Sequence, residues 1–567
     1  MKNDSTDSQM TGYAKSLVSA SEGLMELVDR DRYSPAYGCF FYPYWRSKTS
    51  GYVNARCQEA VYTLALIYRN DYPGNRCRGV FEARELARAG MLYWARLQHP
   101  DGSFDEWYRG EHGFAATAFS AFAVSRAFTL LRDELAPADK KILLKTFRSA
   151  AGWLQSHDDL VKINHEAVVA AALYSLGEVL DESALAGEAS RKVDRVLDRQ
   201  TGEGWFPELG GLDTGYSFLT LEYLSQCYLF SPRDRLKEAL ERALGFLVFF
   251  VHPDITTGRE YNLCGNSYVS LLAAAIMARF SPIARRLFSE GIARGNVIEQ
   301  LAQDDLSRCY HLYNGLLAYD RAREVLPAFD EISPPLPCLG DPFRKNFPES
   351  LMTAVRKSGY YGLVSANCGG LLKLFSSPGK GEGYPAFVDR GYSVRGATGT
   401  VLHSFLLSRA NEAKLDENGV LKITASFRPG SYLFPGPLSR LLLDAVSSMP
   451  GGYHLVKSGV DFFRRRKKAS FQLTAVPGRI SPWRLKRTIT FRPDLVLVRD
   501  EIKTEEGRGD GEIAIDLEER DGSRVVGRPL SGLEDELRRA LVARGKAVVE
   551  KELRPTASGV KVTGSVF

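Results

Sequence analysis

A repeated segment in the first half of the chain constrains its fold more than any other feature. Asp101–Glu106 aligns without gaps with Glu203–Glu208, and further along Glu111–Phe114 aligns with Asp213–Tyr216. Each copy is a glycine-containing loop followed by a helical pattern. Recurrence of a loop and a helix at a long interval is typical of arrays of helical hairpins. About six such hairpins can close into an α/α toroid, in which the loops and helix ends at one rim line a central cleft.

The spacing of apolar residues changes along the chain. Up to about Asp330, apolar residues recur at the period of an α-helix, in segments of ordinary helix length. From about Lys373 the period is two, as in Leu421–Ser426 and Phe471–Val476, which is typical of strands. The Pro-rich segment Ser333–Pro348 separates the two parts and reads as a linker.

Together these signals predict the fold class. We expect a multidomain α and β protein, with an N-terminal α/α toroid of helical hairpins over residues 1–345. A C-terminal antiparallel β-sandwich is expected over residues 346–567. The rim of the toroid is then the natural place for a binding site.

Composition excludes whole classes of protein. Hydrophobic residues make up 44% of the 567 residues and charged residues 25%, the balance of a soluble globular chain. No apolar run approaches the roughly 20 residues that span a bilayer, so no membrane span is expected. The first residues are polar and include acids, which does not fit a signal peptide, and we therefore predict a cytoplasmic location.

The net charge and the spacing of the cysteines limit which partners and cofactors are expected. The formal net charge of +6 favours an anionic small molecule or polymer without requiring a nucleic acid. The eight cysteines form no CxxC pair, and no cluster of His, Asp and Glu has metal-ligand spacing. We therefore expect no metal, no cofactor, no nucleic-acid partner and reduced thiols, while the oligomeric state stays unknown.

Comparison of the two repeats singles out Tyr216. Where one copy has Phe114, the other has Tyr216, so the ring is present twice but the hydroxyl once. A phenol near a helix start is a candidate general acid or base. The alternative is a core aromatic residue whose hydroxyl reaches the surface.

A second candidate is the polar triplet Asn164-His165-Glu166, which opens a strongly apolar helix. An Asn amide can donate hydrogen bonds to a carboxylate and lower the cost of an enolate-like charge. A His can take or give a proton near neutral pH. The alternative is that Asn164 is an N-cap and His165 a satisfied surface residue.

Further polar residues stand at loop-to-helix junctions. Arg259 can form a bidentate pair with a substrate carboxylate, although a structural ion pair with a neighbouring Glu is the alternative. Acids before a helix are commonly caps. The candidates for substrate binding are His112, Glu208, Asp213, Arg259, Glu260 and Tyr261.

Several phrases of the chain carry a family resemblance. In the helical half these are DGSFDEWYRGEHGFAATAF, KINHEAVVAAALY and EGWFPELGGLDTGYSFLTLEYL, and in the β half RTITFRPDLVLVRDEI. By their order and spacing, with an Asn-His pair opening one helix and a Tyr opening a later one, they resemble the heparinase II/III-like and alginate-lyase-like polysaccharide lyases.

The resemblance implies cleavage of a uronate-containing, anionic polysaccharide or oligosaccharide by β-elimination, with no metal. It implies that Asn164 neutralises the uronate carboxylate, while His165 and Tyr216 share proton abstraction from C5 and donation to the leaving oxygen. The family usually adds a His from the β-sandwich. Here His403 is a better candidate than His454, although its flanks depart from the family motif.

Other functions stay open. A glycoside hydrolase or a uronate epimerase can use the same toroid, and a hydrolase would need a carboxylate pair such as Glu208 with Asp213 or Glu106 with Glu111. A non-catalytic glycan-binding or biosynthetic accessory protein needs no convergent catalytic residues. A lyase leaves an unsaturated sugar, a hydrolase adds water and an epimerase cleaves nothing.

Overall fold

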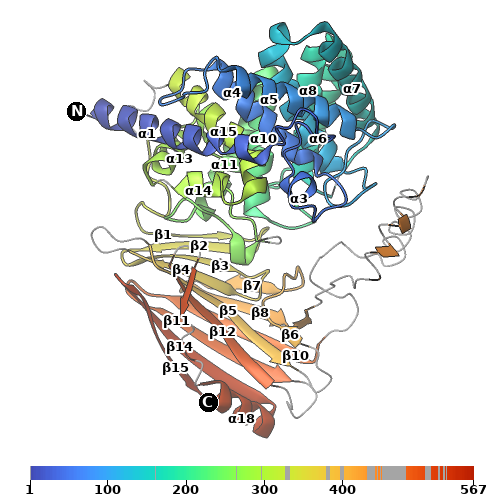
Figure 1. Ribbon diagram of the computed structural model, residues 1–567. Helices are drawn as coiled ribbons and strands as arrows, with labels where there is room; N and C mark the ends of the chain where they lie inside the picture. The colour runs from blue at the N-terminus through green and yellow to red at the C-terminus, as the bar shows by residue number, and fades with distance from the viewer. Residues whose placement is uncertain are drawn as a thin grey trace.

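The computed structural model describes residues 2–159, 161–262, 265–294, 296–325, 333–377, 384–395, 401–430, 481–504, 512–521, 524–527 and 533–567, with a few isolated residues elsewhere. In these residues the chain forms a helical domain followed by a β domain, as Figure 1 shows. The predicted strand Phe471–Val476 lies outside the described residues.

The helical domain contains a closed inner ring. Each inner helix packs against the next inner helix in chain order, and the last inner helix packs against the first. A cavity of ≈ 150 Å³ is lined by residues from all of them, so the ring surrounds it. The α/α toroid predicted from the repeat is therefore confirmed. The inner helices are α4 (Ala60–Arg69), α6 (Phe114–Leu131), α8 (Ile163–Leu180), α10 (Thr214–Phe230), α12 (Leu271–Met277) and α15 (Asp305–Glu324).

An outer layer of amphipathic helices covers this ring. In α11, for example, Leu236, Leu240, Leu244 and Leu247 are buried along one face, which is the apolar stripe expected of a surface helix. The inner helices are buried on nearly all sides, as in α8. The outer helices are α1 (Lys2–Glu22), α5 (Phe81–Leu97), α7 (Pro137–Ser156), α9 (Ser183–Leu197), α11 (Asp234–Leu247) and α13 (Pro282–Arg294).

The positions of α6 and α1 in the toroid explain which of their residues are apolar. The segment Phe114–Glu134, which contains α6, is long and apolar enough to cross a membrane by composition, but 72% of its apolar window is buried in this domain. Its place in the inner ring accounts for that apolarity. Helix α1 begins with polar residues, yet Met10, Tyr13, Ala14 and Leu17 are buried along one face.

The β domain consists of two sheets, and in the described residues their strand pairs are all antiparallel. The first has the order β1-β2-β3-β4-β5-β12-β13, with β6 beside β5 and β9 beside β6, and the second has the order β15-β14-β11-β10-β8-β7. Side chains from both sheets share one buried cluster, and α18 (Glu534–Arg544) covers β12 and β14. The predicted β-sandwich is confirmed.

The strand bounds of the first sheet are β1 (Phe343–Phe347), β2 (Met352–Lys357), β3 (Tyr360–Ser365), β4 (Leu371–Ser376), β5 (Ala386–Arg395), β6 (Val401–His403), β9 (Arg428–Pro429), β12 (Glu512–Asp521) and β13 (Arg524–Gly527). Those of the second are β7 (Glu412–Leu415), β8 (Val420–Ser426), β10 (Trp483–Phe491), β11 (Val496–Thr504), β14 (Lys546–Thr556) and β15 (Gly559–Val566).

The β domain has strands before Lys373, the residue from which the sequence shows a period of two. Every residue of β3 and β4 is buried, because these strands lie between the toroid and the second sheet. The Tyr361 hydroxyl donates to the Phe249 carbonyl of the toroid, while Tyr360 packs in the core between the sheets. Strands covered on both faces read as continuous apolar runs. Strand β1 crosses the boundary predicted at residue 345, and the domain division stays a prediction.

The two domains meet through packed and charged side chains. Lys373 of β4 pairs with Glu260 of the toroid at 2.7 Å, and both side chains are nearly fully buried. Phe347 packs edge-to-face on Phe246. The Glu203 carboxylate accepts hydrogen bonds from the backbone N–H groups of Glu349 and Ser350. Both hydrogen-bonded and apolar contacts therefore set the position of the β domain on the toroid.

Candidate functional site

Residues at the helix starts of the toroid form a continuous series of contacts, which we call the rim ring. His165 meets the edge of Phe119, and the Arg56 guanidinium lies 4.0 Å from the ring centres of both Phe119 and Tyr310. On the other side, Tyr310 is followed by His311, which stacks on Tyr268 at 5.2 Å. These side chains come from segments far apart in the sequence, and the fold gathers them around one mouth of the toroid.

The rim ring continues to the start of α10. Asn266 Oδ1 accepts a hydrogen bond from the Tyr268 N–H. A Cβ built on Gly215 would lie 2.7 Å from Asn266 Cγ, so this position needs a glycine for the two segments to approach. Tyr216 follows directly. Its ring is half-buried against the toroid core, and its N–H donates to Asp213 Oδ1 at 3.0 Å.

Asn164 lies at the second position of α8, and the N-cap is Lys162. The alternative that Asn164 is the N-cap is therefore wrong. A carboxylate from the neighbouring loop serves the helix start instead, because the Asn164 N–H donates to Glu208 Oε1 at 2.6 Å. Asn164 is 2% exposed, so a ligand reaches its amide only when neighbouring side chains shift.

His165 is held in one orientation by Asp159. Its Nδ1 lies 2.9 Å from Asp159 Oδ2, and its ring is flanked by Phe114 and Phe119. Burial lowers the pKa of His165, so the imidazole is neutral at pH 7. When the Nδ1–H group donates its hydrogen bond to Asp159, Nε2 carries the lone pair, which is the tautomer that a general base requires.

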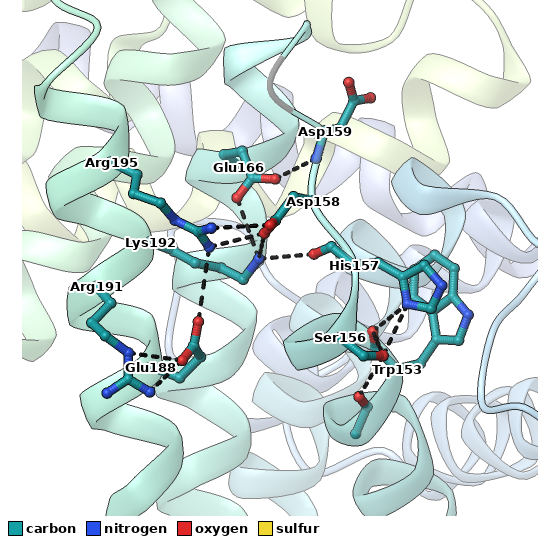
Figure 2. A network of polar contacts seen from close by, with 11 residues as sticks. Trp153, Ser156, His157, Asp158, Asp159, Glu166, Glu188, Arg191, Lys192 and Arg195 are labelled. Carbon is teal, nitrogen blue, oxygen red and sulfur yellow. Dashed lines mark hydrogen bonds and ion pairs between the residues drawn. The ribbon is translucent and has the colours of Figure 1, made fainter. Parts of the chain in front are cut away.

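The loop that carries Asp159 is anchored by a buried lysine, as Figure 2 shows. Lys192 of α9 donates to the His157 carbonyl at 2.9 Å and to Asp158 Oδ1 at 2.8 Å, and it lies 3.3 Å from Glu166 Oε2. The other oxygen of Glu166 accepts a hydrogen bond from the Asp159 N–H. Glu166 therefore faces the loop rather than a ligand, and the network fixes the carboxylate that orients His165.

The acids of the two repeats accept hydrogen bonds from backbone N–H groups of loops and helix starts. Glu111 Oε2 accepts from the N–H groups of Glu106 and Trp107 at 2.7 Å each. Asp213 caps α10, and Glu208 serves the start of α8. Burial raises the pKa of Glu111 to about 7 and that of Glu208 to about 8. These contacts support the structural alternative for the acids.

The remaining substrate-binding candidates occupy different surroundings. The backbone N–H of Arg259 donates to the Asn266 carbonyl, which brings Arg259 close to the rim ring. The carboxylate of Glu260 pairs with Lys373 between the domains, and the Tyr261 hydroxyl lies 2.9 Å from His252 Nε2 in the interior. His112 contacts Asp101 and stacks on His99 within its own loop. Arg259 therefore lies beside Asn266 of the rim ring.

His403 lies at the end of β6 in the β domain. Its Nδ1 is 2.8 Å from Ser393 Oγ, and its ring packs on Phe405. Within the described part of the chain, the contacts of this side chain are with the β domain. The loop that follows β6 does reach the toroid, since a Cβ on Gly211 would touch Leu407. The structure therefore brings near neighbours of His403 in the sequence to the toroid.

Sequence reasoning missed Asp159, Lys192 and Arg56. An acid six residues before His165 was a usable signal for Asp159. No comparable signal marks Lys192, which is on another helix, or Arg56, which precedes α4.

Comparison with known families gives one match. Residues 26–254 match the model of the ulvan lyase N-terminal domain. The matched segment includes Asn164, His165 and Tyr216 but not Arg259. A comparison with curated protein sequences gives no match.

Solved structures share the fold over most of the chain. A Paenibacillus xanthan lyase matches with a TM-score of 0.52 and 10% identity, covering 90% of this chain and 46% of that one. The chondroitin AC lyase of Streptomyces coelicolor A3, solved with chondroitin sulphate, matches with a TM-score of 0.55 and 11% identity, covering 90% of this chain and 67% of that one. This chain thus spans about half the length of the first lyase and two thirds of the second. The predicted resemblance to polysaccharide lyases is confirmed.

Proposed function

We propose that this protein is a polysaccharide lyase that cleaves an anionic, uronate-containing glycan by β-elimination. The observation that carries the proposal is the pair formed by His165 and Asp159 next to Asn164 at the start of α8. This arrangement lies in the segment that matches the ulvan lyase domain. A neutral, oriented imidazole beside an amide is the equipment needed to remove a weakly acidic proton next to a carboxylate.

Asn164 is proposed to stabilise the charge on the uronate carboxylate. An amide has two N–H donors, and the positive end of the α8 dipole lies at the same point. Removal of the C5 proton makes the carboxylate more electron-rich. Fixed donors aimed at such a developing charge are usually the largest single contribution to catalysis.

His165 is proposed to remove the C5 proton through Nε2. Asp159 accepts a hydrogen bond from the Nδ1–H group and stabilises the imidazolium that forms. The electron pair of the C5–H bond forms the C4–C5 double bond, and the C4–O bond breaks. Tyr216 is proposed to donate its proton to the leaving oxygen. Afterwards His165 releases the proton from C5 to solvent and Tyr216 takes one up from solvent, so both groups return to their starting states. The role of His403 in this step remains an expectation from the family resemblance.

The hydrolase alternative has less support. A hydrolase needs two carboxyl groups that flank the scissile bond, whereas Glu111 accepts hydrogen bonds from two loop N–H groups and Asp213 caps α10. The accessory-protein alternative stays open, because a glycan-binding protein can retain the same rim.

The test is product analysis with purified protein and a panel of acidic glycans. A lyase releases a sugar with a C4–C5 double bond conjugated to the carboxylate, which absorbs in the ultraviolet. Activity should fall in an Asp159→Asn variant, which loses the orienting charge while keeping a side chain of the same shape. Saturated products from every cleaved glycan would contradict the proposal.

A further inference from the structure

Arg409 lies on the loop of the β domain that reaches the toroid. A Cβ built on Gly210 would be 3.3 Å from Arg409 Nη2, and one on Gly211 would touch Leu407. The guanidinium therefore packs on the backbone of the toroid loop that contains Glu208. Gly210 has a φ of +82°, a left-handed conformation for which glycine is best suited.

This toroid loop is joined directly to the start of α8. The Leu209 N–H donates to the Val161 carbonyl at 2.9 Å, and Glu208 forms a bridge with Lys162. Glu208 also accepts from the Asn164 N–H. Arg409 is thus separated from the proposed carboxylate-binding residue by a single short loop.

The backbone on both sides of Arg409 is held rigidly. Ser408 and Asn411 are buried, and the Ser408 N–H donates to the Asn367 carbonyl. The Asn411 amide donates to the carbonyls of Ala366 and Asn367. Asn367 in turn donates to the Ser350 carbonyl, and the Ser350 N–H donates to Glu203 of the toroid. A chain of hydrogen bonds therefore sets the position of Arg409 relative to the toroid.

Arg409 itself is exposed. Within the described residues, no carboxylate forms an ion pair with its guanidinium. An exposed, unpaired Arg on a rigid backbone at a domain boundary differs from an Arg on a flexible loop, because binding has to order only its side chain and not the backbone. The planar guanidinium matches a carboxylate or a sulfate through two parallel hydrogen bonds.

We propose that Arg409 is a substrate-binding residue contributed by the β domain, and that it binds an anionic group of the glycan next to the sugar held at Asn164. The inference rests on the proposed function for the nature of the ligand. It assigns the β domain a direct part in substrate recognition through Arg409, in addition to the catalytic part that the family resemblance implies for His403.

The test measures binding, which does not depend on turnover. The probes are end-labelled oligosaccharides of chondroitin sulfate and of chemically desulfated chondroitin, and the readout is fluorescence anisotropy. In Arg409→Ala, Kd should rise about tenfold, the change expected when one charge-assisted hydrogen bond is lost. The Kd of Arg409→Lys should lie between those of the wild type and Arg409→Ala, since lysine keeps the charge but not the planar arrangement of donors.

The matched control is Arg539→Ala, which removes an exposed Arg from α18 and should leave Kd unchanged. A loss on both probes indicates a contact with the carboxylate, and a loss only on the sulfated probe indicates a contact with the sulfate. Equal Kd values for Arg409→Ala and the wild type would overturn the inference, as would a wild type that binds neither probe. Arg409-dependent binding without any unsaturated product would contradict the lyase proposal and leave this inference standing.

Discussion

Glu208 illustrates how one side chain can combine structural and electrostatic effects. Its carboxyl group is buried, and burial raises its pKa to about 8. In the described residues Oε2 has no hydrogen-bond partner, while Oε1 accepts from the Asn164 N–H. At neutral pH the group is therefore mostly protonated in the folded protein and ionised in the unfolded chain.

This difference predicts a pH-dependent stability. The pKa of Glu208 is higher in the folded protein than in the unfolded chain, so the protonated carboxyl group stabilises the fold. This stabilisation is complete below the unfolded pKa near 4.5 and is lost as the pH rises to about 8. Glu208→Gln keeps the acceptor oxygen but cannot ionise. The melting temperature of this variant should therefore fall less than that of the wild type between pH 5 and 8, as measured by thermal denaturation across that range. Parallel curves would show that Glu208 does not titrate in this range.

Tyr216 is the residue on which the proposed chemistry depends most directly. Tyr216→Phe should reduce turnover by ~10²–10⁴, because a proton-transfer group is lost. The melting temperature should change little, since Phe114 occupies the aligned place in the other repeat and is also half-buried against the core. Turnover and melting temperature are measured on the same preparation.

The control for Tyr216→Phe is Tyr228→Phe. Tyr228 lies on the same helix near its far end and packs on Phe280, so loss of its hydroxyl should not affect turnover. Wild-type activity of Tyr216→Phe on a confirmed substrate would assign Tyr216 to the core and exclude it from the mechanism.

At the scale of elements, the segment between α7 and α8 depends on a residue of α9. Lys192 is fully buried and contacts His157, Asp158 and Glu166. This segment contains Asp159, so α9 acts through that carboxylate on the position of His165, the proposed general base.

Lys192→Met should therefore affect both stability and chemistry. Removing one partner of a buried ion pair typically costs roughly 3–5 kcal/mol. Because the Asp159 carboxylate is then less well placed beside His165, kcat/KM should fall. The acidic side of the pH profile of kcat/KM should also shift to a different pH. Glu166→Gln in the same variant removes the uncompensated charge and should restore part of the stability. The measurements are chemical denaturation and a pH profile of kcat/KM.

The adjacent residue provides the control for Lys192. Arg191 pairs with Glu188 on the same helix, but its side chain is 70% exposed. Exposed pairs contribute ~0–1 kcal/mol, so Arg191→Met should leave both stability and the pH profile nearly unchanged. An unchanged pH profile in Lys192→Met would limit Lys192 to a structural role.

At the scale of the whole molecule, a buried ion pair connects the two domains. Lys373→Met leaves the Glu260 carboxylate buried without its cation, and we expect a loss of roughly 3–5 kcal/mol in the free energy of unfolding. The double variant Lys373→Met with Glu260→Met should recover part of the loss. Lys503→Met, which disrupts an exposed pair with Glu501, serves as the control.

A further variant, Glu260→Gln, separates a structural role of Glu260 from a role in substrate binding. If Glu260 joins the domains, Glu260→Gln lowers stability and leaves KM for a confirmed glycan unchanged. A higher KM with unchanged stability would instead return Glu260 to the substrate-binding residues.

Much of the architecture is evident in the sequence because it depends on local periodicity. The repeat that aligns Phe114 with Tyr216 predicts the toroid, and alternation in segments such as Leu421–Ser426 predicts the sandwich. Local patterns fail where surroundings decide burial. Strands β3 and β4 lack alternation because both of their faces are covered.

The candidate site divides in the same way. Asn164, His165 and Tyr216 are recognisable in the sequence, since polar residues at the start of apolar helices stand out against their surroundings. Tertiary structure alone decides that Glu260 pairs with Lys373 while Arg409 has no acidic partner among the described residues. Whether a charge is neutralised depends on which distant segments pack beside it, and that packing is a property of the whole fold.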